Sequence, residues 1–337
     1  MNIRYKQLSG GVMKVFLYIC MLIVSGFVSL PTAAHAATYA DDSLIVRSIL
    51  DTNGHQDIAV NDVTVDSAGR IIWLELSNVP QGRFIFNITV LPASVGRLTA
   101  LTLLNIGANN LPTVPAEICS LTNLVRLDLY GNHLTVFPDG IQFLTKLIYL
   151  NLRFNEITSV PAEISSLIHL QVLELGFNKI SQLPGTIGNL VALKHLGVQY
   201  NQLTVLPSEV SRLSNLIFLA VDDNRLSILP DSLVRLSAGI KFYCANNSIC
   251  TLPPALESWV RLHDQTWPGN QECANKVQEP VKRTGQAIPH SGRRGNGTYN
   301  LIGQNIRPNN AQRGTNLSSQ PIGSIIIRSG ERVLQVK

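Results

Sequence analysis

Apolar positions recur along this chain with a period of 23 residues. Residues 124–134 carry leucine at the first, fourth and sixth positions, asparagine at the ninth and leucine at the eleventh. The same skeleton, with leucine or isoleucine at the eleventh position, begins again at Leu101, Leu147, Leu170, Leu193 and Leu216, with a worn copy at Gly239. A fixed period of this length indicates a solenoid, in which each repeat buries its apolar face against its neighbours.

Each copy predicts a short strand followed by a turn. In residues 127–129 the apolar side chains alternate with others, so a strand there points leucines inward and the intervening side chains outward. The asparagine follows where the chain turns, and its carboxamide can satisfy backbone groups of two coils. We therefore predict a structural, non-catalytic ladder of asparagines: Asn109, Asn132, Asn155, Asn178, Asn201, Asn224, Asn247 and, in a broken eighth copy, Asn270.

The second half of each copy predicts the opposite, convex wall. It places a proline three residues before an apolar residue and six before a leucine, as in Pro161, Ile164 and Leu167. Proline has no N–H to donate to a sheet, but it suits the first position of a short helical turn. The apolar residues of this half should close the core from behind.

The spacing of leucines and asparagines resembles that of the leucine-rich repeat family, over residues 71–273. The resemblance implies an α/β repeat solenoid, a horseshoe with a parallel sheet on its concave face. The open N-terminal end should carry a cap, because an uncapped solenoid exposes core and unpaired strand groups. Residues 37–70 resemble the amino-terminal flanking regions of bacterial and plant members of the family.

Within the cap, residues 41–50 predict a helix capped by Asp41, Asp42 or Ser43. Residues 51–54 should end it in a turn, and residues 60–65 and 70–76 should form two strands. The first coil then holds seven extra residues near positions 81–87. This apolar insertion either folds back on the cap or contacts a partner.

Residues 1–36 have the layout of a signal peptide. Lys14 precedes an apolar run at 15–30, and a small-x-small site predicts cleavage after Ala36. The run is shorter than the ~20 residues of a spanning helix, so we expect no transmembrane anchor after cleavage. Translation can start at Met1 or Met13. The expected location is secreted, or the outer surface of a bacterial cell.

The C-terminal part differs in charge from the repeats. Residues 37–273 hold 14 basic and 20 acidic side chains, whereas residues 274–337 hold 10 and 2. The basic excess therefore belongs to the tail and gives no evidence that the repeats bind nucleic acid. We interpret residues 274–297 as a linker and 298–337 as a small β tail. The tail resembles carboxy-terminal sorting segments of Bacteroidetes and Fibrobacter proteins, which implies attachment at the cell surface; a passive β tail is the alternative.

The sequence contains none of the common catalytic or cofactor-binding motifs that we considered. It has no phosphate-binding glycine loop, paired zinc-ligand motif or nucleophile elbow. We expect neither an enzyme nor a cofactor or metal site. Cys250 and Cys273 are separated by 23 residues, which places them one coil apart. That distance and an exported location predict a disulfide, whereas Cys244 should be a buried apolar residue.

The remaining candidate chemistry is binding. Outward strand positions carry aromatic and charged side chains, the usual anchors of interfaces, and exposed aromatic rows can also stack on sugars. We predict that the concave face binds a protein or glycan; the alternative is a structural spacer of the envelope. Phe154, Phe177 and Tyr200 either join that site or pack on one another. The candidate residues are Arg126, Asp128, Tyr130, Tyr149, Arg153, Phe154, Phe177, His195, Tyr200, Phe218, Asp222 and Tyr243.

Overall fold

The structure is a computed structural model that describes residues 38–78, 84–269 and 271–273. These residues fall within one compact unit, Thr38–Ala287. The predicted signal peptide at 1–36, the linker at 274–297 and the tail at 298–337 lie outside the described residues. Among the described residues, no helix has the length and apolar character needed to cross a membrane.

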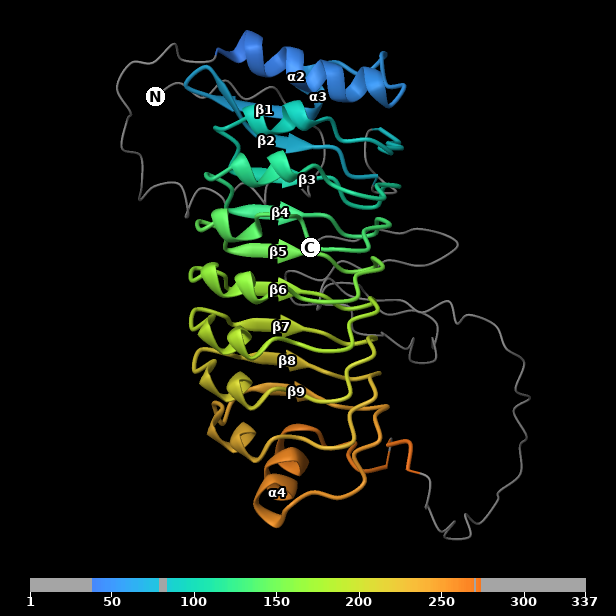
Figure 1. Ribbon diagram of the computed structural model, residues 1–337, viewed down its shortest axis with the longest axis vertical. Coiled ribbons are helices and arrows are strands. Elements are labelled where there is room, and N and C mark those ends of the chain that lie inside the picture. Colours follow the sequence, from blue (N-terminus) through green and yellow to red (C-terminus); the bar gives the residue numbers. More distant parts are fainter. Residues whose placement is uncertain (1–37, 79–83, 270, 274–337) are drawn as a thin grey trace, which may run out of the picture. The chain divides into compact units, whose positions relative to one another are not determined.

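In the part of the chain that the structure describes, nine strands form one sheet in the order of the chain (Figure 1). β1 and β2 pair antiparallel, and every later pair is parallel. Leu127 lies opposite Leu150 and Leu150 opposite Leu173, so the sequence period is also the register. The expected repeat solenoid is confirmed. Its strands are β1 (Thr64–Ser67), β2 (Arg70–Glu75), β3 (Leu103–Asn105), β4 (Arg126–Asp128), β5 (Tyr149–Asn151), β6 (Val172–Glu174), β7 (His195–Gly197), β8 (Phe218–Ala220) and β9 (Lys241–Tyr243).

The convex wall consists of short 3₁₀ helices, one for each coil. The prolines precede these helices: Pro161 and Pro184 are N-caps with extended ψ angles of 148° and 144°. The expectation that proline would be the first helical residue was wrong by one position, since its fixed φ is equally compatible with an extended cap. The helices are η1 (Ala93–Arg97), η2 (Ala116–Ser120), η3 (Ile141–Phe143), η4 (Ala162–Ser166), η5 (Gly185–Asn189), η6 (Ser208–Arg212) and η7 (Asp231–Arg235).

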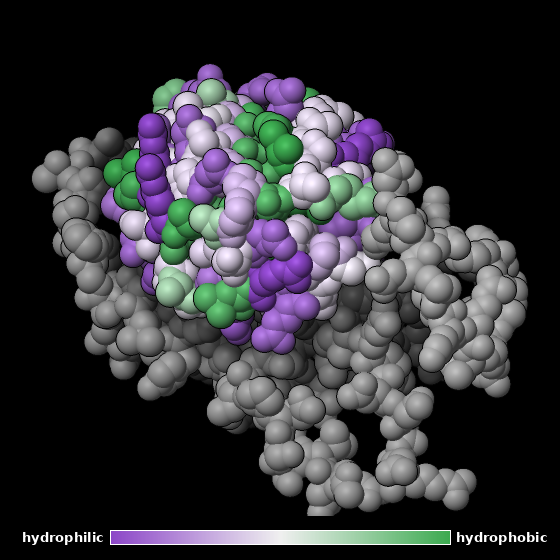
Figure 2. Space-filling model, turned by 90° about the horizontal axis from the view of Figure 1, so that it is seen from below, coloured by the Kyte–Doolittle hydropathy of each residue, from purple (hydrophilic) through white to green (hydrophobic). Residues whose placement is uncertain are grey.

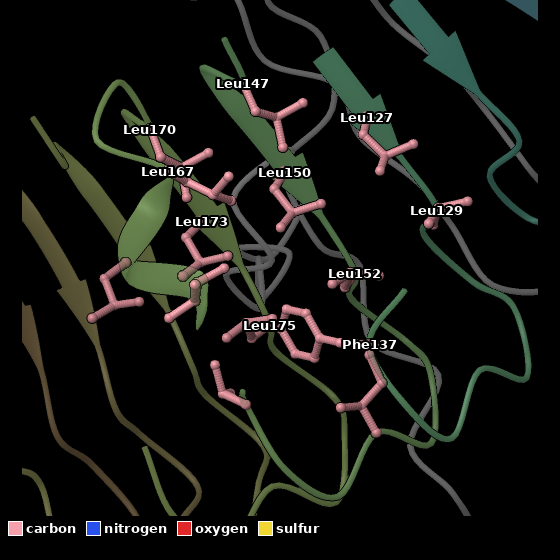
Figure 3. Packing of buried hydrophobic residues seen from close by; sticks show 14 of the residues in the cluster. Leu127, Leu129, Phe137, Leu147, Leu150, Leu152, Leu167, Leu170, Leu173 and Leu175 are labelled. Atoms are coloured by element: carbon pink, nitrogen blue, oxygen red, sulfur yellow. The ribbon is translucent and has the colours of Figure 1, made fainter. Parts of the chain in front are cut away.

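The leucines between the sheet and the convex wall form one continuous core (Figure 3). Leu147, Leu150 and Leu152 of one coil pack beside Leu170, Leu173 and Leu175 of the next, and all six are fully buried. Burying a leucine side chain is worth about 1.5–3 kcal/mol. The core therefore gains stability coil by coil.

The asparagine ladder joins each coil to the one before it. The N–H of Leu134 donates to Oδ1 of Asn155 at 3.0 Å. Nδ2 of Asn155 lies at 3.0 to 3.2 Å from the carbonyl oxygens of Leu129, Leu152 and Arg153. The other six asparagines from Asn109 to Asn247 repeat this pattern.

At the N-terminal end, helix α2 (Tyr39–Thr52) begins earlier than the sequence suggested. Thr38 is the N-cap: its hydroxyl accepts the N–H of Asp41, and its own N–H donates to the Asp41 carboxylate. None of the three residues proposed as caps holds that position. The predicted first strand also starts late, because Val60–Val63 forms a helical turn, α3, before β1.

Asp42 has a different role from a helix cap. It is fully buried and accepts hydrogen bonds from Nε and Nη2 of Arg70 at 2.8 and 3.1 Å. It also accepts the N–H of Ile71 at 2.9 Å. A bidentate pair between a guanidinium and a carboxylate is among the stronger polar contacts in proteins. This pair connects the cap helix to β2.

The insertion in the first coil folds back on the cap where the structure describes it. Phe86 is buried in the core and packs edge-to-face on His55 at 5.4 Å. The N–H of Asn87 also lies 3.1 Å from Nε2 of His55. Ile85, in contrast, is 82% exposed. Residues 79–83 lie outside the described residues.

The C-terminal end closes with a ten-residue helix, α4 (Pro254–His263), which the repeat pattern did not predict. Trp259 of this helix and Trp267 beyond it are buried in the core. Asp264 accepts the N–H of Cys244 at 3.0 Å and satisfies a backbone group beside the last described strand. Figure 2 views the molecule from this end, where apolar side chains form small groups among polar ones.

Gln271 takes over the last place in the ladder. The N–H of Ile249 donates to its Oε1 at 3.2 Å, and its Nε2 donates to the carbonyl of Cys244 at 3.0 Å. Asn270, the residue expected there, lies outside the described residues. Glutamine is one methylene longer, so a carboxamide from the next position reaches the same kind of partners.

Cys250 and Cys273 form a disulfide with Cα atoms 5.8 Å apart. The bond ties the chain around Gln271 to the preceding coil. Cys244 and Cys119 are buried free thiols. Burial raises the pKa of the Cys119 thiol to about 12, so it is held as an unreactive side chain.

Candidate functional site

The strands present one sheet face toward the leucine core and the other away from it. We call the second one the concave face. Its side chains come from alternate strand positions and align in columns with the register of the sheet. One column runs Arg126, Tyr149, Val172, His195, Phe218 and Lys241 across β4 to β9.

On β4 and β5, an arginine holds the neighbouring side chains of the concave face in place. The guanidinium of Arg126 lies 3.6 Å from the ring centroid of Tyr149 and 2.8 Å from Oδ2 of Asp128. Asp128 is 7% exposed and also receives the N–H of Tyr130. Burial raises the pKa of the Tyr149 hydroxyl, helped by the Asp128 charge, so this ring stays neutral. Tyr149 therefore offers a partner a neutral hydroxyl that can form hydrogen bonds.

A second polar group lies in the middle of the face. Nη1 of Arg153 is 3.7 Å from Oε2 of Glu174, and Nε2 of His195 is 2.8 Å from Oε1 of Glu174. The His195 contact is short enough for an ion pair, but its ring is not aligned for a hydrogen bond. Arg153 and Glu174 are 3% and 2% exposed. The expectation that Arg153 would be open to solvent was wrong, because neighbouring coils enclose it.

Two glycines make space for this group. A Cβ on Gly197 would lie 2.3 Å from Oε2 of Glu174, and a Cβ on Gly176 would lie 2.9 Å from the carboxamide carbon of Gln199. With a side chain at either position, Glu174 or Gln199 would have to move. The glycines therefore let Glu174 and Gln199 lie flat across adjacent strands.

Downstream, the face is aromatic. His195 stacks on Phe218 with ring centroids 4.0 Å apart, and Phe218 meets Tyr243 at 5.5 Å. Phe218 is 4% exposed, which corrects the expectation of an open anchor, whereas Tyr243 is 37% exposed. Tyr243 is therefore the most accessible of these rings.

The row of Phe154, Phe177 and Tyr200 packs on itself. Consecutive ring centroids are 4.0 and 4.1 Å apart with nearly parallel planes. Each residue has a positive φ, between 53° and 59°, a backbone conformation that costs roughly 1–2 kcal/mol for a non-glycine residue. Stacking stabilises the folded row by about 0.5–1.5 kcal/mol per ring pair. Much of each ring face covers a neighbour, so the row is poorly placed to stack on a sugar.

Asp222 and Asp223 form an acidic pair beside the aromatic row. Burial, followed by the Asp223 charge, raises the pKa of the Asp222 carboxyl to about 7. The pKa of Asp223 is also raised, chiefly by burial. Among the described residues no cluster of three or more histidine, cysteine or acidic side chains has a geometry suited to a metal ion.

Replacing Asp222 with asparagine should raise the melting temperature more at pH 8 than at pH 5. The unfolded carboxyl has a pKa of about 3.9, so between that value and about 7 the folded chain keeps a proton that the unfolded chain has lost. The free energy of unfolding therefore falls as pH rises through this window. Asparagine removes the charge that has to be buried. Thermal melts at both pH values test this, with exposed Asp231→Asn as control; an equal effect at both would contradict it.

Sequence reasoning did not select Glu174 or Gln199 for the site. A signal for them was present: glycine interrupts two outward columns at Gly176 and Gly197, and each gap lies next to one of these long polar side chains. Arg126, Asp128, Tyr130 and Tyr149 lie together on β4 and β5 and the turn that follows β4. Asp222 lies apart from them, after β8.

Comparisons with known proteins agree with this architecture. Residues 122–180 and 145–203 match the family model described as Leucine rich repeat. The crystal structure of PEPR1-AtPEP1 has a TM-score of 0.52 and 26% identity, covering 61% of this chain and 31% of that one. A leucine-rich repeat protein of Leptospira interrogans is 36% identical with a TM-score of 0.48, over 52% of this chain and 44% of that one. No curated protein matches the chain.

The fold is of the leucine-rich repeat type, and strands β4 to β7 lie within the residues that match the family model. The match spans less than half of each of these two solved chains. Leucine-rich repeat proteins commonly mediate protein binding.

Proposed function

We propose that this chain is a secreted or cell-surface binding protein whose concave face recognises a protein or peptide partner. The observation that carries the proposal is the arrangement of Arg126, Tyr149, His195 and Tyr243 on the face opposite the core. Contacts within the sheet hold these side chains before any partner arrives. Preorganised aromatic and arginine side chains are typical interface anchors, because little conformational entropy is lost on binding.

A protein partner suits this face better than a glycan does. Sugar recognition by aromatic residues uses free ring faces. Here Phe154, Phe177 and Tyr200 cover one another, and His195 covers Phe218. The groups that this face offers to a partner are hydroxyls, ring edges and paired charges.

The proposed location rests on features of the ends. The signal-peptide pattern of residues 1–36 and the sorting-segment resemblance of residues 298–337 support export and surface attachment. The Cys250–Cys273 disulfide is consistent with an oxidising compartment. Deleting residues 298–337 should release the protein from the cell surface into the medium; retention at the surface would assign anchorage to another part.

Replacing Arg126, Tyr149 and Tyr243 together with alanine should weaken partner binding by several kcal/mol. The full secreted chain serves as bait for partner capture, and the affinity of the captured partner is then measured for wild type and variant. A matched control replaces the exposed convex residues Phe143, His169 and Arg212 and should bind as wild type does. Circular dichroism melts confirm that both variants fold.

Unchanged affinity in the concave variant would contradict the proposed site. It would move recognition to the convex wall, where Phe137, Gly140 and Glu163 line a hollow, or to exposed Ile85 of the insertion. Failure of any partner to bind would favour the structural-spacer alternative.

A further inference from the structure

The downstream end of the concave face carries two exposed positive charges. β7, β8 and β9 are neighbours in the sheet there (Figure 1). Lys194 directly precedes β7, Lys241 is the first residue of β9, and both are exposed. Among the described residues, neither ammonium group has an ion pair or a hydrogen bond. The arginines of the same face differ from these lysines, since Arg126 and Arg153 each lie beside a carboxylate.

The two lysines lie two coils apart, where the strands begin. The N–H of Ile217 donates to the carbonyl oxygen of Lys194 at 2.9 Å, and the N–H of Lys241 donates to that of Ile217 at 2.9 Å. Neighbouring strands are about 4.8 Å apart, so roughly 10 Å separates the two lysine backbones. Each ammonium lies at the end of a flexible four-carbon chain. Both ammonium groups can therefore reach an anionic group that lies between them.

An accessible apolar surface accompanies these charges. Ile217 directly precedes β8 and is 58% exposed, and Tyr243 of β9 is 37% exposed. The Tyr243 ring contacts Phe218, with the ring centroids 5.5 Å apart. A single exposed apolar residue is common on protein surfaces, but here two of them lie with two unpaired charges of the same sign. We call this group the lysine patch, and its members are Lys194, Ile217, Lys241 and Tyr243.

We propose that the lysine patch binds an acidic segment of the protein partner, in which an aspartate or glutamate lies next to an apolar residue. The carboxylate of the segment accepts hydrogen bonds from the two ammonium groups. The neighbouring apolar side chain packs on Ile217 and on the Tyr243 ring. The inference rests on the proposed function, because it assigns a partner chemistry to one end of the same concave face.

Charge elsewhere on the domain limits how acidic this segment can be. Residues 37–273 hold 14 basic and 20 acidic side chains. Asp222 and Asp223 follow β8, on the side of the sheet where the strands end. A long polyanion, such as a nucleic acid or a sulfated glycan, would meet these negative charges, whereas a peptide with one or two carboxylates can place them on the lysine patch. Charge complementarity therefore favours a short acidic stretch of a protein.

The test is a selection of random linear peptides displayed on phage against the full secreted chain. Wild type should enrich peptides with aspartate or glutamate beside an aromatic or aliphatic residue. A synthetic copy of a selected peptide, acetylated and amidated at its ends, should bind about fivefold more tightly than the same peptide with glutamine in place of each acidic residue. Its affinity should fall as the salt concentration rises, because the lysines are exposed.

The lysine variant combines Lys194→Glu and Lys241→Glu. It should reverse the preference, so that a peptide with lysine in place of the acidic residues binds more tightly. The matched control combines Arg212→Glu and Arg235→Glu, two exposed positions of the convex wall, and should keep the wild-type preference at the same net charge. Ile217→Ser should lower the affinity about fivefold and keep the preference for the acidic peptide. Melting curves establish that each variant folds.

The outcomes separate the two proposals. Reversal of the preference in the lysine variant, but not in its control, supports the lysine patch. Peptides that lose binding in the Arg126, Tyr149 and Tyr243 variant but keep their affinity in the lysine variant would overturn the patch and leave the concave face as the binding surface. Peptides that lose binding in neither variant would overturn both proposals. A selection that enriches no acidic peptide would overturn the patch, as would heparin or single-stranded DNA that displaces the selected peptide at a lower concentration than the peptide itself.

Discussion

Replacing Asp42 with alanine should lower the free energy of unfolding by about 3–5 kcal/mol. The carboxylate is fully buried and accepts three hydrogen bonds, two from Arg70 and one from the N–H of Ile71. Alanine would leave a guanidinium and a backbone N–H without their partner at the first parallel strand. The cap helix would lose its polar connection to the sheet.

Chemical denaturation measures this effect, with Asp66→Ala as the control. Asp66 is exposed in β1, so its removal should cost less than about 0.5 kcal/mol. A double variant that also replaces Arg70 with methionine should recover part of the loss, because it removes the uncompensated charge. A loss below about 1 kcal/mol for Asp42→Ala would show that the pair does not support the cap.

Replacing Asn155 with leucine should be at least as costly, roughly 4 kcal/mol or more. The substitution leaves the N–H of Leu134 and three carbonyl oxygens without the carboxamide that joins them. It also places a branched side chain where a flat one fits between two coils. Leucine is apolar and suited to the adjacent core, so the loss cannot be attributed to hydrophobicity.

The matched control is Asn215→Leu. Asn215 donates one hydrogen bond to the carbonyl of Val191 from an exposed position, so its replacement should cost about 1 kcal/mol or less. Urea melts followed by circular dichroism compare the two variants. Similar small losses of unfolding free energy in both variants would mean that the ladder does not stabilise the fold.

The periodic part of the structure was predictable from the sequence. A side-chain period of two within each strand, repeated every 23 residues, determines which residues face the core and which strands pair. Leu127, Leu150 and Leu173 are therefore in register. The same count predicted that Cys250 and Cys273 are one coil apart.

What the period does not describe was harder to predict. The pairing of Asp42 with Arg70 joins residues 28 positions apart through helix packing, which no local pattern encodes. Gln271 enters the ladder because a longer side chain can reach from the wrong register position. On the concave face the period gives the direction of each side chain but not its contacts. It therefore could not decide that the aromatic row stacks on itself or that Glu174 lies beside Arg153.

The ladder also makes the length of this protein adjustable. Each asparagine bonds to its own coil and to the one before it, so no ladder contact spans more than one repeat. Deleting residues 155–177 would join Phe154 to Asn178 and bring together the same residue types that meet at Phe177 and Asn178. The newly joined residues would therefore lie in a turn of the same sequence type as before the deletion. A change of one whole coil would shorten the concave face by one strand while leaving both capped ends as they are.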